Sequence, residues 1–229
     1  MMKFYDVNGA EISKEQFVTI YGDSYFIGNK RIVNRVVQNS RHIEEEIEQI
    51  LCNGIKTPID VVHILAWKIG KLKHYECENE NKFVYHKDWE NAENMDVKIR
   101  NKKFDIRSFS NYIAENTDCI ESLYREDPQS ALNKLNEGSV NGIGSVYLIT
   151  MLYFITKREC PIYDRFAMKA IEAIVNDVKP GSVIKEKQLP DKSSKKFGKI
   201  METEMKEYID DLKYVFGNDY KDRNVDRAL

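Results

Sequence analysis

Hydrophobic residues recur along most of this chain at the three- and four-residue spacing of amphipathic helices. Within residues 40–54, Ile43, Ile47, Ile50 and Leu51 share one helical face. A possible serine cap precedes this stretch and a glycine follows it, as helix ends require. The same spacing predicts further helices over 32–37, 57–69, 109–116, 118–126, 128–137, 145–156, 164–176, 195–216 and 219–228. The pattern predicts a mainly α fold.

Two segments break this periodicity and favour short β-hairpins. Residues 3–7 lead into Asn8-Gly9, which is a type I′ turn signal, and residues 10–12 follow. Near the middle of the chain, apolar residues flank the polar stretch 101–103 and permit a second hairpin. The rest of 74–105 is polar and aromatic with weak helical periodicity. We therefore expect a helical protein with one or two short hairpins.

Composition and charge set limits on function. The chain has 229 residues, of which 42% are hydrophobic and 31% are charged, and this is enough to build a sizeable core. The formal net charge of −2 counts against a generic nucleic-acid binder, which is usually basic overall. A local basic face on an acidic body remains compatible with that charge.

The cysteines and histidines do not form a metal-binding pattern. No two cysteines stand at C-x-x-C spacing, and the N-terminus has no apolar signal core, so we expect reduced thiols in a cytoplasmic protein. The histidines do not pair at metal-ligand spacing, and we expect no metal site. No apolar run reaches the length of about 18 residues that a membrane span needs. The residues concerned are Cys52, Cys77, Cys119, Cys160, His42, His63, His74 and His86.

The segment 135–148 is interpreted as a helix, a tight turn and a second helix. Gly142 and Gly144 allow backbone angles that are closed to other residues, and they let the main chain approach a ligand closely. The turn also presents N–H groups at the start of the following helix, where the helix dipole attracts a phosphate. Such a contact positions DNA without reading its sequence. An ordinary helix C-cap followed by a turn gives the same pattern.

The residues after the turn add a second motif that favours one protein family. The stretch Pro161-Ile162-Tyr163-Asp164 places Asp164 twenty residues after Gly144, at the start of a new helix. Over residues 135–170, this order of Gly-Ile-Gly, apolar helix, Pro-apolar-x-Asp and helix resembles the helix–hairpin–helix DNA glycosylase superfamily. That superfamily includes the endonuclease III and 8-oxoguanine glycosylase types.

The resemblance implies a fold and a set of site residues. Two helical lobes are expected, one formed by 1–107 with 179–229 and the other, which carries the hairpin, by 108–178; DNA and a flipped base would lie between them. Asp164 corresponds to the catalytic aspartate. The residues expected to contact DNA are Gly142, Ile143, Gly144, Ser145 and Arg165, and the aromatic candidates for the base pocket are Tyr163, Phe166, Trp67 and Tyr147.

Departures from the family pattern restrict the expected chemistry. Val146 stands where many bifunctional members have the lysine that attacks the sugar, so strand cleavage through that residue is not expected. Asn141 replaces a common proline, and Tyr147 and Leu148 replace small residues. The cysteines of the iron–sulfur members are missing, so no cofactor is expected. The resemblance implies a monomeric, monofunctional glycosylase that releases a flipped base by hydrolysis.

Each of these residues has a purely structural interpretation as well. Asp is an excellent helix N-cap, and aromatic side chains most often pack in cores. The mixed charges of residues 222–227 are typical of an exposed terminal helix. Two alternatives to a glycosylase are therefore open: a non-catalytic hairpin protein that recognises DNA shape, and a helical interaction protein whose Gly-x-Gly is only a turn.

Overall fold

The structure is a computed structural model and is mainly helical. It describes residues 2–27, 31–33, 36–38, 40–77, 80–85, 89, 92, 97–99, 102–140, 142–184 and 187–229. Chain contacts divide it into two compact units, Met1–Gly28 with Pro161–Leu229 (unit 1) and Asn29–Cys160 (unit 2). These boundaries differ from the lobes that the family resemblance implies, 108–178 and 1–107 with 179–229, and those lobes stay a prediction.

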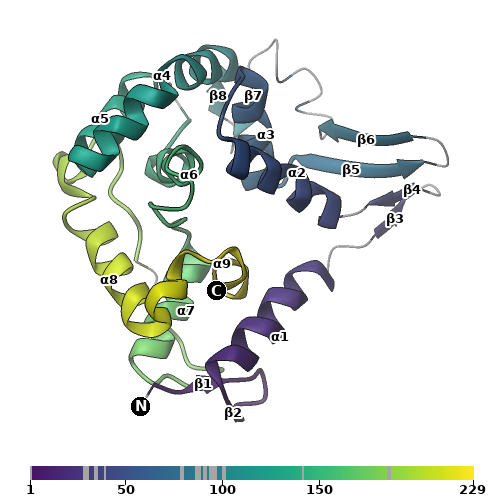
Figure 1. Ribbon diagram of the computed structural model, residues 1–229, viewed down its shortest axis with the longest axis vertical. Coiled ribbons are helices and arrows are strands. Elements are labelled where there is room, and N and C mark those ends of the chain that lie inside the picture. The colour runs from purple at the N-terminus through teal and green to yellow at the C-terminus, as the bar shows by residue number, and fades with distance from the viewer. Residues whose placement is uncertain are drawn as a thin grey trace. The chain divides into compact units, whose positions relative to one another are not determined.

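Unit 1 combines the two ends of the chain. Its helix α1 packs against α9, and α7 packs against α8. Two strands from the N-terminal end pair as a small hairpin beside α1 (Figure 1). The elements are β1 (Phe4–Tyr5), β2 (Glu11–Ile12), α1 (Lys14–Ile27), α7 (Arg165–Val175), the 3-10 helix η2 (Lys195–Lys199), α8 (Glu204–Phe216), the 3-10 helix η3 (Gly217–Lys221) and α9 (Arg223–Ala228).

Unit 2 is built around one helix, α6 (Ser145–Ile155), which contacts four other helices. Every residue of α6 from Leu148 to Ile155 is buried, because this helix is apolar on all sides rather than on one stripe. The helices around it are α2 (Ser40–Asn53), α3 (Pro58–Lys68), α4 (Ile106–Glu126) and α5 (Pro128–Glu137).

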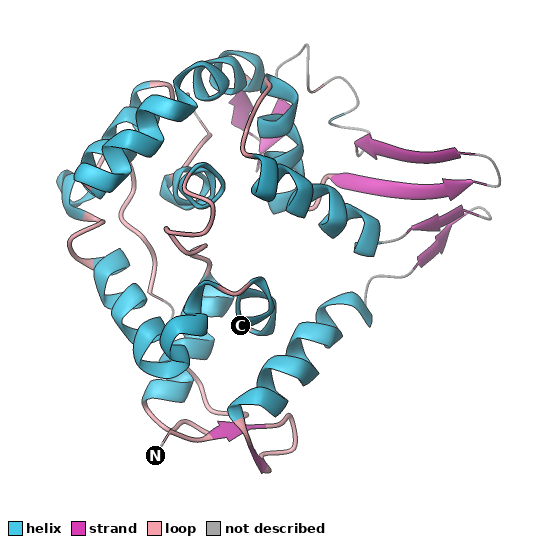
Figure 2. Cartoon of the chain, viewed as in Figure 1, coloured by secondary structure: helices cyan, strands magenta, loops and turns pink. Residues whose placement is uncertain are grey.

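The strands of unit 2 include a four-stranded antiparallel sheet that the sequence pattern did not predict (Figure 2). Ile32 and Val33, expected with Val36 and Val37 on one helical face, lie in one strand and the two later valines in the next, and the polar region after residue 71 supplies two long paired strands. Ile and Val suit strands because their branched side chains fit a pleated surface. The strands, in sheet order, are β3 (Arg31–Val33), β4 (Val36–Gln38), β5 (Leu72–Cys77) and β6 (Glu80–Tyr85).

Both expected hairpins are present. The central one pairs β7 (Val97–Ile99) with β8 (Lys102–Phe104). The N-terminal one pairs β1 with β2, but its turn is not type I′, because only Gly9 has a positive φ, of 80°, and Asn8 does not. Gly9 N donates to Asp6 O at 3.0 Å, and the Asp6 carboxylate accepts from Asn8 N at 2.9 Å. The aspartate side chain therefore fixes a turn that needs left-handed backbone at one position only.

Several helix boundaries differ from the expected ones. The two helices expected over 109–116 and 118–126 are one continuous helix, α4, within which the Thr117 hydroxyl donates to Ile113 O at 2.8 Å. The helix expected over 195–216 is divided into η2 and α8. Its break lies at Thr203, whose backbone (φ −115°, ψ −94°) is not helical. The helix over 128–137 matches α5 at both ends.

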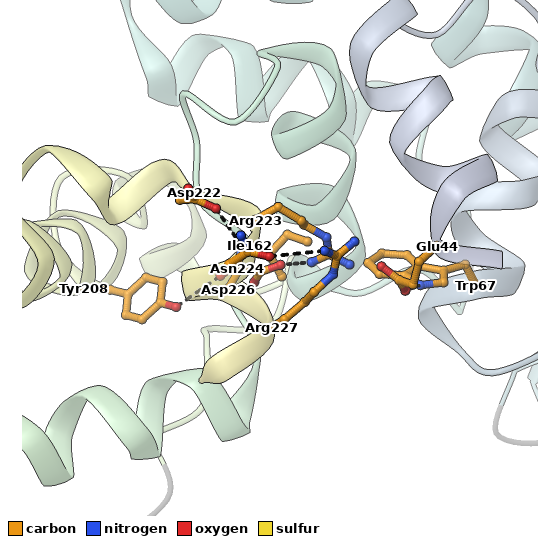
Figure 3. A network of polar contacts seen from close by, with 9 residues as sticks. All are labelled: Glu44, Trp67, Ile162, Tyr208, Asp222, Arg223, Asn224, Asp226 and Arg227. Carbon is orange, nitrogen blue, oxygen red and sulfur yellow. Dashed lines mark hydrogen bonds and ion pairs between the residues drawn. The ribbon is translucent and has the colours of Figure 1, made fainter. Parts of the chain in front are cut away.

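The last helix, α9, is not the exposed helix that its mixed charges suggested. Arg223 is only 5% exposed, and its guanidinium contacts the Asp226 carboxylate within the same helix (Figure 3). Asp222 caps the helix by accepting from Asn224 N at 2.7 Å. A charge that is buried must be paired, and the i, i+3 spacing of Arg223 and Asp226 provides that pairing.

Cys52, Cys119 and Cys160 are not joined in disulfides, and Cys160 is buried. Burial raises the pKa of Cys160 to about 12, whereas Cys52 and Cys119 are exposed. Because the thiolate is the reactive form, we expect iodoacetamide at pH 8 to modify Cys52 and Cys119 in the native protein and to leave Cys160 unmodified until the chain is denatured. Peptide mass spectrometry would measure this, and rapid native modification of Cys160 would contradict it.

Candidate nucleic-acid interface

The turn before α6 is sharp and is anchored by a buried residue. Gly142 has a φ of 102°, which an L side chain rarely adopts. Ile143 is 1% exposed, and its amide donates to Val140 O at 3.3 Å. Asn141 lies outside the described residues. The turn is therefore held to the protein by the Ile143 side chain while Gly142 reverses the chain direction.

Gly144 differs from the expectation drawn from the sequence. Its backbone (φ −101°, ψ 175°) is extended and open to any residue, so the turn does not need glycine here for conformational reasons. A Cβ added at Gly144 would meet nothing within 4 Å. The absence of a side chain leaves open space beside the main chain, and this is what close approach of a ligand requires.

The first turn of α6 carries the positive end of the helix dipole. Gly144 is the N-cap residue, and its carbonyl accepts from Tyr147 N at 3.0 Å and Leu148 N at 3.3 Å. Gly144 has no side chain with which to cap the helix, and the first turn of α6 contains no acidic residue. Ser145 is 5% exposed. A helix start without a capping carboxylate is suited to an external anion.

Gly138, which the sequence marks only as the end of a helix, fixes the approach to this turn. Gly138 ends α5, and a Cβ there would lie 2.0 Å from Cδ1 of Tyr112 on α4. The Tyr112 hydroxyl donates to Lys134 O at 2.9 Å, which holds the ring in place. The ring of Tyr112 thus occupies the volume that any other residue at 138 would need. The sequence signal was a glycine directly after a helix, which also fits an ordinary C-cap.

Asp164 is the N-cap of α7. Its Oδ1 accepts from Phe166 N at 2.8 Å and from Ala167 N at 3.0 Å, and the residue is half-buried. This geometry matches the structural interpretation of the aspartate, because the carboxylate satisfies two amides at the positive end of the helix. A capping aspartate and a catalytic aspartate share these features, so the cap does not exclude the second role.

The residues after Asp164 form an exposed pair. Phe166 is 62% exposed, and the Arg165 guanidinium carbon lies 4.7 Å from the centre of its ring. This distance is within the range of a cation–π contact. Phe166 is therefore accessible to a ligand on the surface, whereas the sequence had suggested it as a lining residue of a pocket.

Tyr163 is buried in unit 1 and has acidic surroundings. It is 3% exposed, and its ring lies edge-on to Tyr208 with ring centres 5.1 Å apart. Burial, followed by the charges of Glu204, Glu207 and Glu172, raises the pKa of Tyr163 to about 12. The Tyr208 hydroxyl donates to Ile162 O at 3.2 Å (Figure 3). These contacts give Tyr163 a packing role, and a role in a base pocket stays a prediction.

The other two aromatic candidates belong to unit 2. The indole of Trp67 donates to the buried carboxylate of Glu44 at 2.6 Å (Figure 3). The same ring lies edge-on to Phe154, with ring centres 5.9 Å apart. Tyr147 is half-buried in the first turns of α6. The packing of Trp67 was foreseen as one of its two interpretations, but its hydrogen bond to Glu44 had no sequence signal.

The predicted site residues fall into two groups. Tyr163, Asp164, Arg165 and Phe166 lie in unit 1, and the turn residues 142–145, with Tyr147 and Trp67, lie in unit 2. Among the described residues, no three His, Cys, Asp or Glu side chains gather as metal ligands. None of the described helices has the length and apolar character of a membrane span.

Comparisons with known proteins found no match to this chain. No family model matches the chain, and neither a curated protein nor a solved structure is similar to it. The resemblance to helix–hairpin–helix glycosylases therefore depends on the residues of 135–170 themselves.

Proposed function

We propose that this protein is a monofunctional, DNA glycosylase-like enzyme that binds DNA through the turn before α6 and releases a flipped base with the help of Asp164. The observation that carries the proposal is the geometry of the turn. Gly142 at φ 102° reverses the chain, and Gly144 starts a helix that has no acidic residue in its first turn and open space at the Cα of Gly144. This arrangement provides backbone donors for a phosphate without a side chain in the way.

The second part of the proposal concerns the carboxylate. Breaking an N-glycosidic bond develops positive charge on the sugar, which a nearby carboxylate stabilises while it orients water. Asp164 is an acid held at a helix start by two amides, and it is only partly buried, so it is accessible. The first test is release of free base from duplex DNA that carries one of a panel of damaged bases, without strand cleavage. Failure on a broad panel would refute the enzymatic proposal.

If the turn contacts DNA, replacing its two glycines should affect stability and DNA affinity differently. Gly144→Ala should lower the free energy of unfolding by only about 0.5–1 kcal/mol, because alanine is a poorer N-cap than glycine although the backbone here is open to it and its Cβ meets nothing. DNA affinity should nevertheless fall, since the methyl group occupies the space that a phosphate would approach. Gly142→Ala should lower stability by about 1–2 kcal/mol, because alanine is strained at φ 102°.

Fluorescence anisotropy at low salt and thermal denaturation would measure these effects. The matched control is Gly198→Ala in η2, in unit 1, where an added Cβ also meets nothing within 4 Å. We expect this control to change neither stability nor DNA affinity. Equal DNA binding by Gly144→Ala and wild type would show that the turn is not the contact.

A second candidate, a non-catalytic DNA-binding protein, is favoured by the cap geometry of Asp164. The carboxylate has a sufficient structural reason to be present, because it satisfies two amides of α7. This candidate predicts salt-sensitive DNA binding that persists in Asp164→Asn and is lost in the Gly144 variant, with no base release from any substrate. Absence of DNA binding at low salt would leave a helical interaction protein.

A further inference from the structure

Phe166 is an unusual surface residue. It is a large aromatic side chain in the first turn of α7, and 62% of its surface is exposed. Exposing such a ring forgoes part of the stabilisation that burial of a large apolar side chain provides. One face of the ring is covered by a cation, the Arg165 guanidinium, whose carbon lies 4.7 Å from the ring centre. Proteins that bind single-stranded nucleic acids stack the bases on exposed aromatic side chains, and arginine adds a cation–π contribution to this stacking.

Arg165 and Phe166 directly follow Asp164 and are connected to it by a hydrogen bond. The amide of Phe166 itself donates to Asp164 Oδ1 at 2.8 Å, so ring and carboxylate are attached to one short, hydrogen-bonded segment. Lys169 follows Arg165 by four residues and therefore lies on the same side of α7. An apolar protein partner would find one ring beside two cations there, whereas a nucleotide offers both a flat base and an anionic phosphate.

We propose that Arg165 and Phe166 form a stacking platform for an unpaired nucleobase, with Arg165 also contacting the phosphate of the same strand. The inference rests on the proposed function and specifies its substrate class: DNA that contains an unpaired base, in a bulge or a single strand. In a continuous duplex both faces of every base are already stacked on neighbours. The platform therefore contributes only where a base is unpaired.

The test compares three fluorescein-labelled DNAs, a single strand, its perfect duplex and the same duplex with a one-nucleotide bulge, by anisotropy with the full chain. Phe166→Leu keeps an apolar side chain but removes the aromatic face, and we expect it to weaken binding to the bulge and the single strand about five- to tenfold. Duplex affinity should not change. Phe166→Trp keeps an aromatic face and should bind the bulge and the single strand as tightly as wild type does. Arg165→Gln should lower the salt slope of binding by about one.

The matched control is Tyr214→Leu on α8, where another exposed aromatic side chain, 66% accessible, is removed. This variant should bind all three DNAs as wild type does, and melting curves should show that each variant is folded. Equal binding of the bulge by wild type and Phe166→Leu would overturn the platform while leaving the proposed function intact, provided that the duplex is bound. No binding of any DNA by the wild type would overturn both.

Discussion

Asp164→Asn should reduce the rate of base release about 100-fold or more while leaving the fold and DNA binding in place, because general acid–base catalysis contributes about that much. Asparagine keeps the shape of the side chain but cannot stabilise positive charge on the sugar or accept a proton from water. It is also as good an N-cap as aspartate, so its oxygen can accept from Phe166 N and Ala167 N as Asp164 does.

Stability distinguishes the catalytic role of Asp164 from its cap. The free energy of unfolding of Asp164→Asn should fall by less than about 1 kcal/mol, which is the value of a charge at a helix end. Asp164→Ala also removes the cap and should cost about 0.5–2 kcal/mol. Single-turnover base release, measured beside thermal denaturation, would separate the effects. An asparagine variant that is as active as wild type would show that Asp164 is only a cap.

Gly138→Ala should lower the free energy of unfolding by about 3 kcal/mol. The added Cβ would lie 2.0 Å from Cδ1, 2.4 Å from Cγ and 2.5 Å from Cε1 of Tyr112, so ring or backbone must move. Overpacking of this kind typically costs about 1–3 kcal/mol, and the tether of the Tyr112 hydroxyl to Lys134 O makes relaxation harder.

A double-mutant cycle would show the origin of that cost. In a Tyr112→Ala background the obstructing ring is absent, so Gly138→Ala should change stability by less than about 1 kcal/mol, and the two effects should be strongly non-additive. Urea denaturation would measure all four proteins, with Gly198→Ala as the control in open space. A cost below about 1 kcal/mol for Gly138→Ala in the wild-type background would contradict the close packing of the ring.

The helices with strong end signals could be predicted from the sequence, and the sheet could not. Asp127 and Pro128 start α5, and its last residue precedes Gly138, because local caps define both ends. The pairing of β4 with β5 joins Val37 to Glu76 across a long stretch of chain, and no local pattern specifies such a partner. The apolar spacing of Ile32, Val33, Val36 and Val37 fits a helix and a pair of strands alike.

The same division applies to the candidate site. The turn at Gly142 and the helix start at Asp164 follow from the chemistry of single residues and were predictable. The open Cα of Gly144, the ring of Tyr112 against Gly138 and the exposure of Phe166 depend on what packs nearby. These are properties of the tertiary structure, and they supply the sharpest tests of function.

The burial of α6 has a consequence for how the turn before it would bind. The helix is buried from Leu148 to Ile155, so its first amides cannot shift far without disturbing the packing of those residues. Donors that are already fixed in direction lose little conformational entropy when an anion arrives. An anion that binds the amides at the start of α6 would then gain affinity from these contacts without a large cost for ordering the backbone.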